Sequence, residues 1–164
     1  MIVVSDTTPL ISLMKEEHLN LLGRLYGEIL IPDAVFVELT SNPKFTAEAE
    51  LIKNCGFIRV VTVRERKAVD VLRRVSGLDL GESEAIIYVD ENKADILLMD
   101  EEAGRKVAKS MGLHIQGTVG VLLQAYDRKM LSAEQVVEAV RRLRNTKRHI
   151  SERLYQYAED YVRK

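Results

Sequence analysis

Short apolar runs rich in β-branched residues alternate with amphipathic segments along most of this chain. Five of these runs predict strands, over residues 2–5, 28–32, 57–63, 95–100 and 113–117. The segments between them repeat their apolar residues at helical spacing. Strands separated by helices are typical of crossover connections around a parallel sheet. The pattern therefore predicts an α/β fold with a central parallel sheet of about five strands.

The helical periodicity places the other elements between and after these strands. Helices are expected over residues 9–26 (interrupted near 15–18), 33–40, 47–56, 66–77, from about 82 into the early 90s, 101–112, 118–130, 132–145 and 151–164. Gly56 is expected to close the helix over 47–56 in the left-handed conformation. A chain of 164 residues suits one domain. We expect a single domain with a core over about residues 1–130 and C-terminal helices over about 131–164.

Composition narrows the classes of function. Apolar residues make up 46% and charged residues 30% of the chain, which is typical of a globular protein. The formal net charge is −1, so attraction to a polyanion requires a local basic patch or bound cations. The single cysteine, Cys55, excludes an internal disulfide and a thiolate cluster for zinc. No apolar stretch reaches the roughly 20 residues that cross a bilayer, and no basic leader is evident. We therefore expect a cytoplasmic protein with no membrane contact.

Two predicted strands end in aspartate, Asp6 in "VVSDTTP" and Asp100 in "DILLMD". In an open parallel sheet, ligands bind beyond the carboxyl ends of the strands. Both carboxylates are therefore expected at one edge of the sheet. Asp6 has a second interpretation, because Thr7 or Thr8 can cap a helix with Pro9 in its first turn and Asp6 would then only complement the helix dipole.

Two further acidic candidates lie on predicted helices. Glu38 stands in the otherwise apolar run "AVFVEL", where a charge is costly unless it lines a polar cleft. In "GESEA", Glu82 shares a helix face with apolar residues three and four positions later, whereas Glu84 points to roughly the opposite side. We therefore take Glu82 as the inward carboxylate and Glu84 as the alternative.

Carboxylates that converge without counter-charges repel one another and raise one another's pKa values. A hard divalent cation removes this conflict, because Mg²⁺ and Mn²⁺ prefer oxygen ligands. Such an ion lowers the pKa of a bound water and supports attack on phosphorus without a catalytic histidine. The three histidines, at positions 18, 114 and 149, lie far apart without ligand spacing.

Five segments in order carry a resemblance to a known family: "VVSDTTPLI", "VFVEL", "LDLGESEAI", "LLMDEEAGRKVA" and "GTVGVLL". Together they resemble the PIN-like nucleases, especially the small prokaryotic group allied to VapC-type toxins of toxin–antitoxin pairs. The likeness runs from about residue 2 to residue 130 and continues more weakly through "SERLYQYA". It implies a three-layer α/β/α sandwich and Mg²⁺- or Mn²⁺-dependent cleavage of RNA phosphodiesters.

The resemblance assigns metal-ligand and catalytic roles to Asp6, Glu38, Glu82 and Asp100. Many of these nucleases have aspartate where this chain has Glu82, and a longer side chain shifts the metal or requires a water bridge. Because Glu101 and Glu102 follow Asp100 directly, the register of the fourth carboxylate stays open by one or two residues.

Two hydroxyl residues also match the family pattern. Thr7 resembles the hydroxyl residue that follows the first aspartate. Thr118, after Gly117, matches a polar position near the site, and its alternative role is to cap its own helix. As partners, the resemblance implies an RNA substrate and a small antitoxin-like protein inhibitor, and we expect a homodimer.

Basic residues are candidates for holding the RNA backbone. Arg105 and Lys106 lie about one turn into the helix after Asp100, and "RRLRNTKRH" holds five lysines and arginines within nine residues. That run is equally consistent with a solvated helix face paired with "AEQVVEA". The tyrosines at 155, 157 and 161 cannot share one face, and core or dimer packing is favoured over base stacking.

Two other α/β classes fit poorly. A phosphoacceptor signalling domain needs an acidic pair after the first strand and a lysine after the last, but the chain has "SDTT" and "QGT" there. A phosphatase with an aspartyl nucleophile needs an aspartate where Thr8 stands. The resemblance therefore implies a metal-dependent endoribonuclease that acts as the toxin of a toxin–antitoxin pair. The alternative is a PIN-like module with a weak or inactive site that binds RNA or protein.

Overall fold

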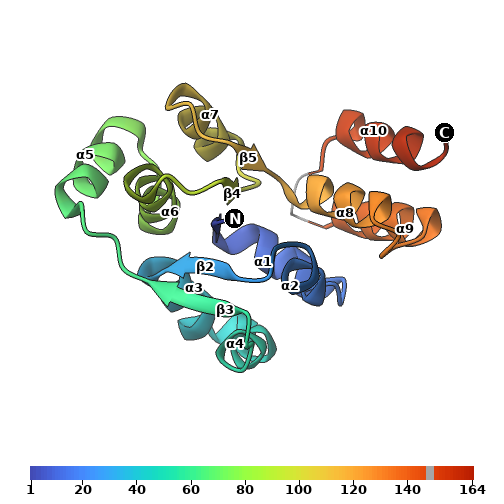
Figure 1. The fold of residues 1–164 in the computed structure, drawn as a ribbon, viewed down its shortest axis with the longest axis horizontal. Coiled ribbons are helices and arrows are strands. Elements are labelled where there is room, and N and C mark those ends of the chain that lie inside the picture. The colour runs from blue at the N-terminus through green and yellow to red at the C-terminus, as the bar shows by residue number, and fades with distance from the viewer. Residues whose placement is uncertain (147–149) are drawn as a thin grey trace.

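The computed structural model describes residues 1–146 and 150–164 and contains a five-stranded sheet in which all strand pairs are parallel (Figure 1). The strands lie in the order β3-β2-β1-β4-β5, with β1 at the centre. Their bounds are β1 Val3–Ser5, β2 Ile29–Pro32, β3 Ile58–Val61, β4 Ile96–Leu98 and β5 Ile115–Gln116. The predicted parallel sheet is confirmed, although each strand is shorter than its predicted range.

Helices fill the connections and the C-terminal part of the chain. Their bounds are α1 Thr7–Lys15, α2 Asn20–Tyr26, α3 Asp33–Ser41, the 3₁₀ turn η1 Pro43–Phe45, α4 Thr46–Lys53, α5 Arg66–Ser76, α6 Leu80–Asn92, α7 Glu102–Ser110, α8 Thr118–Asp127, α9 Ala133–Arg144 and α10 Glu152–Val162. The predicted helix order is therefore confirmed within the described part of the chain.

Neighbouring residues of the central strand face opposite sides of the sheet, because side chains alternate along a strand. Val3 packs into a cluster with residues of α1, α2 and α8, whereas Val4 packs into a second cluster with residues of α6 and α7. Both valines are fully buried. The sheet is thus covered by helices on both faces, which makes the three-layer α/β/α architecture that the resemblance implied.

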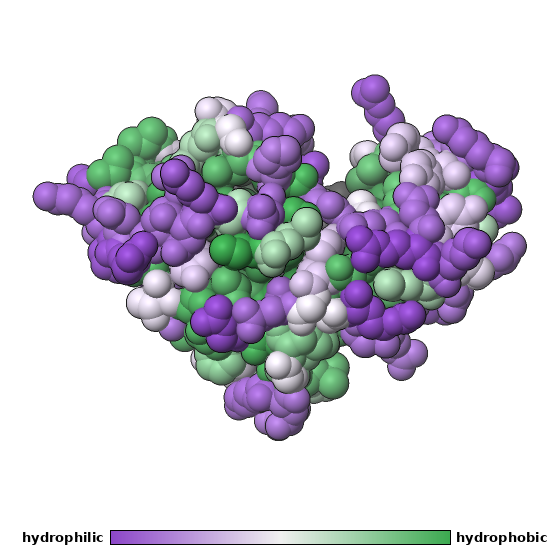
Figure 2. All heavy atoms as spheres, viewed as in Figure 1, coloured by the Kyte–Doolittle hydropathy of each residue, from purple (hydrophilic) through white to green (hydrophobic). Residues whose placement is uncertain are grey.

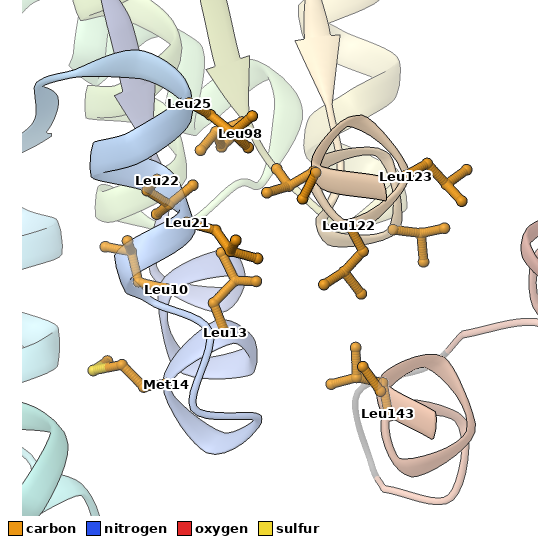
Figure 3. Packing of buried hydrophobic residues seen from close by; sticks show 14 of the residues in the cluster. Leu10, Leu13, Met14, Leu21, Leu22, Leu25, Leu98, Leu122, Leu123 and Leu143 are labelled. Carbon is orange, nitrogen blue, oxygen red and sulfur yellow. The ribbon is translucent and has the colours of Figure 1, made fainter. Parts of the chain in front are cut away.

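The C-terminal helices share the core on one side of the sheet. Leu10, Leu13 and Leu21 lie opposite Leu122, and Leu143 approaches from α9 (Figure 3). Tyr155 and Val162 of α10 belong to the same buried cluster. Helices α9 and α10 therefore share one core with the rest of the described chain.

The three tyrosines of α10 have different environments, as their spacing predicts. Tyr155 is buried, whereas Tyr157 is 57% exposed. The Tyr161 ring contacts Tyr126 edge-on, with ring centroids 6.4 Å apart, and its hydroxyl donates a hydrogen bond to Asp127 Oδ2. Tyr155 and Tyr161 therefore contribute to packing within this chain.

The expected left-handed conformation of Gly56 is wrong. Helix α4 ends at Lys53, and its last turn is closed by the Asn54 N–H, which donates to the Glu50 carbonyl. Among glycines of the described residues, Gly27, Gly77 and Gly112 have positive φ. Helix α4 ends three residues before Gly56, so the turn toward β3 needs no left-handed residue there.

Hydrophilic residues cover much of the face shown in Figure 2, and hydrophobic residues reach the surface between them. On α5, Val71 and Val75 have 47% and 81% of their surface exposed. Among the described residues, none of the helices has the length and apolar character needed to cross a membrane.

Candidate active site

Strand β1 places Asp6 at the carboxyl end of the sheet. The Asp6 N–H donates to the Leu98 carbonyl of β4 at 2.9 Å, so the residue continues the pairing of the two strands before α1 begins. Asp6 occupies the N-cap position, but its side chain makes no capping hydrogen bond to the helix, and only 3% of the residue is exposed. Helix capping therefore does not explain a buried carboxylate at this position.

Five acidic side chains from four segments act electrostatically on one another, and we call them the acidic cluster. They are Asp6 after β1, Glu38 on α3, Asp79 and Glu82 at the start of α6, and Glu101 after β4. Because like charges raise a carboxyl pKa only at short range, the mutual effects indicate that these groups share one region of the molecule.

Burial is the chief cause of the raised pKa values of Asp6, Glu38 and Glu82. Burial, followed by the charges of Glu82, Asp79 and Glu38, raises the pKa of Asp6 to about 8, against the lowering effect of the Thr7 backbone N–H. Burial, then Asp79 and Glu101, raises the pKa of Glu82 to about 7. The Asp6 carboxyl group is therefore largely protonated at neutral pH, and that of Glu82 is near its titration midpoint.

Glu38 is held by a hydrogen bond and by a close approach of α6. The Thr7 hydroxyl donates to Glu38 Oε2 at 2.9 Å. A Cβ atom at Gly81 would lie 3.3 Å from the same oxygen, so glycine there lets the first turn of α6 come close to Glu38. Burial and the charges of Asp79 and Glu101 raise the pKa of Glu38, while the bond from Thr7 lowers it.

Asp79 is a cluster member that the sequence analysis missed. It is the N-cap of α6, and its Oδ1 accepts a hydrogen bond from the Glu82 N–H at 2.8 Å. Helix α6 therefore begins at Leu80, two residues before the expected start at Glu82. The Asp-x-x-Glu spacing of residues 79–82 resembles a capping box and was the available signal.

Asp100 is held by the start of α8. Its Oδ1 accepts from the Thr118 N–H at 2.7 Å, and its Oδ2 accepts from the Thr118 hydroxyl at 2.6 Å. A Cβ at Gly117 would lie 2.9 Å from Asp100 Oδ1, which explains the glycine. The adjacent Glu101 is the residue of this loop whose charge acts on Glu38 and Glu82. Glu101 is therefore a member of the acidic cluster, whereas Asp100 is held by Thr118.

Glu84 contacts α3 and α5, and it is more deeply buried than Glu82, which the helical spacing had indicated as the inward carboxylate. Glu84 is 3% exposed and accepts hydrogen bonds from the Ala34 N–H and from Arg66. A cleft of about 470 Å³ between the starts of α3 and α6 is lined by Asp33, Ala34, Val37, Glu38, Asp79, Leu80, Gly81 and Glu84.

The two basic candidates beside Asp100 differ in their surroundings. Arg105 Nη1 donates to the Met99 carbonyl at 2.9 Å, so this side chain supports the loop after β4. Lys106 is exposed.

The basic run near the C-terminus is largely paired where it is described. Arg141 pairs with Glu138, Arg142 with Glu16 and Glu138, and Arg144 with Glu152. These pairs favour the interpretation of a solvated, paired helix face. Lys147, Arg148 and His149 lie outside the described residues.

The donors of the acidic cluster are all carboxylate oxygens, which suit a hard cation such as Mg²⁺ or Mn²⁺ rather than a softer metal. As they lie, no three His, Cys, Asp or Glu side chains within residues 1–146 and 150–164 make a ready metal-binding group. The chemistry of these donors thus fits a divalent cation.

Comparison with known proteins gives one result that bears on this site. A family model described as PIN domain (DUF3368) matches residues 2–162. No curated protein and no solved structure matches the chain.

Proposed function

Because this chain belongs to the PIN-domain family, we propose that it is a Mg²⁺- or Mn²⁺-dependent endoribonuclease. The observation that carries the proposal is the acidic cluster at the carboxyl end of a parallel sheet, with the pKa of Asp6 raised to about 8. Such a cluster is unfavourable without a counter-charge, and a divalent cation with the phosphates of a nucleic acid is the combination that PIN-like nucleases use.

In this proposal Asp6, Glu38 and Glu82 hold the cation, and Asp100 completes the site. Asp79 and Glu101 add negative charge around them. When bound, the cation supplies Lewis acidity and neutralises charge that develops on the phosphate. Thr7 fixes one oxygen of Glu38, and Thr118 fixes both oxygens of Asp100, so the two threonines orient carboxylates.

The proposed RNA contact is Lys106, which is exposed on α7, the helix that follows Asp100. Arg105 contributes indirectly, because its guanidinium holds the Met99 carbonyl next to Asp100. Because the formal net charge is −1 and Lys106 is the proposed contact, the protein is expected to bind the RNA backbone weakly and with modest salt dependence.

By its resemblance to VapC-type toxins, the protein is proposed to act as a toxin. It would then have a small protein inhibitor and form a homodimer.

A second candidate function is a binding module with a weak or inactive site. The observation that favours it is that no three His, Cys, Asp or Glu side chains of the described chain form a ready metal-binding group. Expression in cells separates the two functions. Growth arrest that disappears in Asp6→Asn supports the nuclease, whereas arrest that persists in this variant supports binding.

The purified protein tests the proposal directly. We expect it to cleave single-stranded or structured RNA in Mn²⁺, and expect EDTA to stop the reaction. Asp6→Asn should reduce cleavage by about 100-fold or more, equivalent to ~3 kcal/mol of transition-state stabilisation. Asp90→Asn, at an exposed position on the second half of α6, is the matched control and should cleave like wild type. Cleavage indifferent to EDTA and to Asp6→Asn would contradict the proposal.

A further inference from the structure

We propose that Glu84 is a positioning residue that sets the distance between the two helices carrying Glu38 and Glu82. The inference rests on the proposed function, because it concerns the cation site that these two carboxylates would form. In this proposal Glu84 connects α6 to α3 and α5 and does not itself bind the cation.

The first part of this link is a helix cap supplied from another element. Helix α3 begins at Asp33 after Pro32, and no side chain at the N-cap position bonds to its first turn. Instead, Glu84 Oε1 accepts the Ala34 N–H at 2.9 Å. A carboxylate at a helix N-terminus satisfies a free N–H and interacts favourably with the helix dipole. Helix α3 is therefore capped by a residue 50 positions further along the chain.

The second part is an ion pair that fixes the Glu84 side chain. Arg66 Nη1 lies 2.8 Å from Glu84 Oε2, so each carboxylate oxygen has a partner on a different helix. The Glu84 side chain is only 4% exposed, whereas that of Arg66 is 50% exposed. A buried carboxylate with both oxygens engaged has little freedom to change rotamer.

The third part is the geometry between the link and the acidic cluster. Ala34 and Glu38 are four residues apart, so they lie one turn apart on the same face of α3. On α6, Gly81 approaches Glu38 Oε2 closely while Glu84, three residues later, holds Ala34. The two helices thus meet at Glu84–Ala34 and at Gly81–Glu38. Loss of the first contact would let α3 shift and move Glu38 relative to Glu82.

The test measures Mn²⁺ affinity by water-proton relaxation, with the metal alone and without RNA. Glu84→Ala should weaken Mn²⁺ binding by about tenfold, the lower end of the effect of removing groups that support metal ligands. Glu91→Ala is the matched control. Glu91 also lies on α6 and accepts the backbone N–H groups of Arg64 and Glu65 at 3.0 Å, but it links α6 to the segment before α5 instead of to α3. It removes the same charge and should change Mn²⁺ affinity much less.

A second variant, Arg66→Ala, distinguishes a positioning role of Glu84 from a purely electrostatic effect on Mn²⁺ binding. It also tests the proposal if Glu84→Ala does not fold. Arg66→Ala removes a positive charge, so electrostatics alone predicts tighter Mn²⁺ binding, whereas loss of positioning predicts weaker binding. Arg64→Ala removes a charge from the same exposed segment and is its control. We expect several-fold weaker binding for Arg66→Ala and no loss for Arg64→Ala.

Asp6→Asn distinguishes failure of this inference from failure of the proposed function. If Asp6→Asn weakens Mn²⁺ binding but the Glu84 and Arg66 variants behave like their controls, the positioning role is wrong and the cation site stands. If wild type does not bind Mn²⁺, or Asp6→Asn binds it equally well, both are overturned.

Discussion

Asp6 has an ionisable carboxyl group in a buried position that disfavours its charged form. It is almost fully buried, and three other carboxylates raise its pKa further, to about 8. Its position follows from a short strand whose two valines are buried on both faces of the sheet. A residue one place beyond such a strand lies at the sheet edge whatever its chemistry. An aspartate there is therefore costly for stability and is expected to serve function.

This cost predicts a pH dependence of stability in the presence of EDTA. The folded-state pKa of Asp6 is about 8 and the usual pKa of an aspartate is 3.8, so between these pH values the folded state binds more protons than the unfolded state. The free energy of unfolding should therefore fall as pH rises from about 4 to 8. Asp6→Asn lacks this contribution and should exceed wild type by more than about 1 kcal/mol at pH 8, a difference that shrinks toward pH 5. Urea denaturation measures it, and equal stabilities at every pH would contradict the account.

At the level of elements, the sequence predicted which strands end in aspartate and which helices carry the acidic candidates. It did not predict every contact between these strands and helices. Asp6 and Asp100 were predictable because parallel strands end at one edge. Asp79 was missed because a helix cap precedes the apolar pattern that marks the helix. Nothing in a single sequence connects Glu84 to Ala34 and Arg66, which are 50 and 18 residues away. Such contacts depend on the packing angle of α3 against α6, which periodicity does not specify.

The approach of α6 to α3 is tested by Gly81→Ala. The added Cβ would lie 3.3 Å from Glu38 Oε2 and 3.5 Å from Val35, so Glu38 must move. Alanine favours the helix by up to about 1 kcal/mol, so we expect unchanged or higher stability together with several-fold lower RNA cleavage. Gly56→Ala is the control, because Gly56 has open space and no positive φ. Equal cleavage by Gly81→Ala and wild type would show that this contact does not position Glu38.

On the scale of the whole molecule, the parallel sheet and its helices bring together carboxylates that lie far apart in the sequence. The C-terminal helices α9 and α10 pack into the core on one side of this sheet. The site residues Asp100 and Thr118 share a small cavity of about 40 Å³ with Leu143 of α9 and Leu154 of α10. The segment after residue 130 resembled the family only weakly in sequence, yet the family model extends to residue 162. A helix can keep a buried apolar face while its individual side chains change. The packing of the C-terminal helices therefore constrains the sequence less than the acidic site does.

The contribution of α10 is tested by comparing two of its tyrosines. Tyr155→Ala removes a buried ring from the shared core and should lower the free energy of unfolding by about 3 kcal/mol. Tyr157→Ala, at a position 57% exposed, should change it by less than about 0.5 kcal/mol. Urea denaturation followed by circular dichroism measures both. Equal effects would mean that α10 is not packed as described.

The most direct test of the central claim, that the acidic cluster holds a divalent cation, is anomalous diffraction at the manganese edge from crystals grown with Mn²⁺. The account predicts an anomalous peak within coordination distance of carboxylate oxygens from Asp6 and Glu82, and no peak there in Asp6→Asn crystals. A wild-type map with no peak among these carboxylates, or with manganese bound only elsewhere, would contradict it.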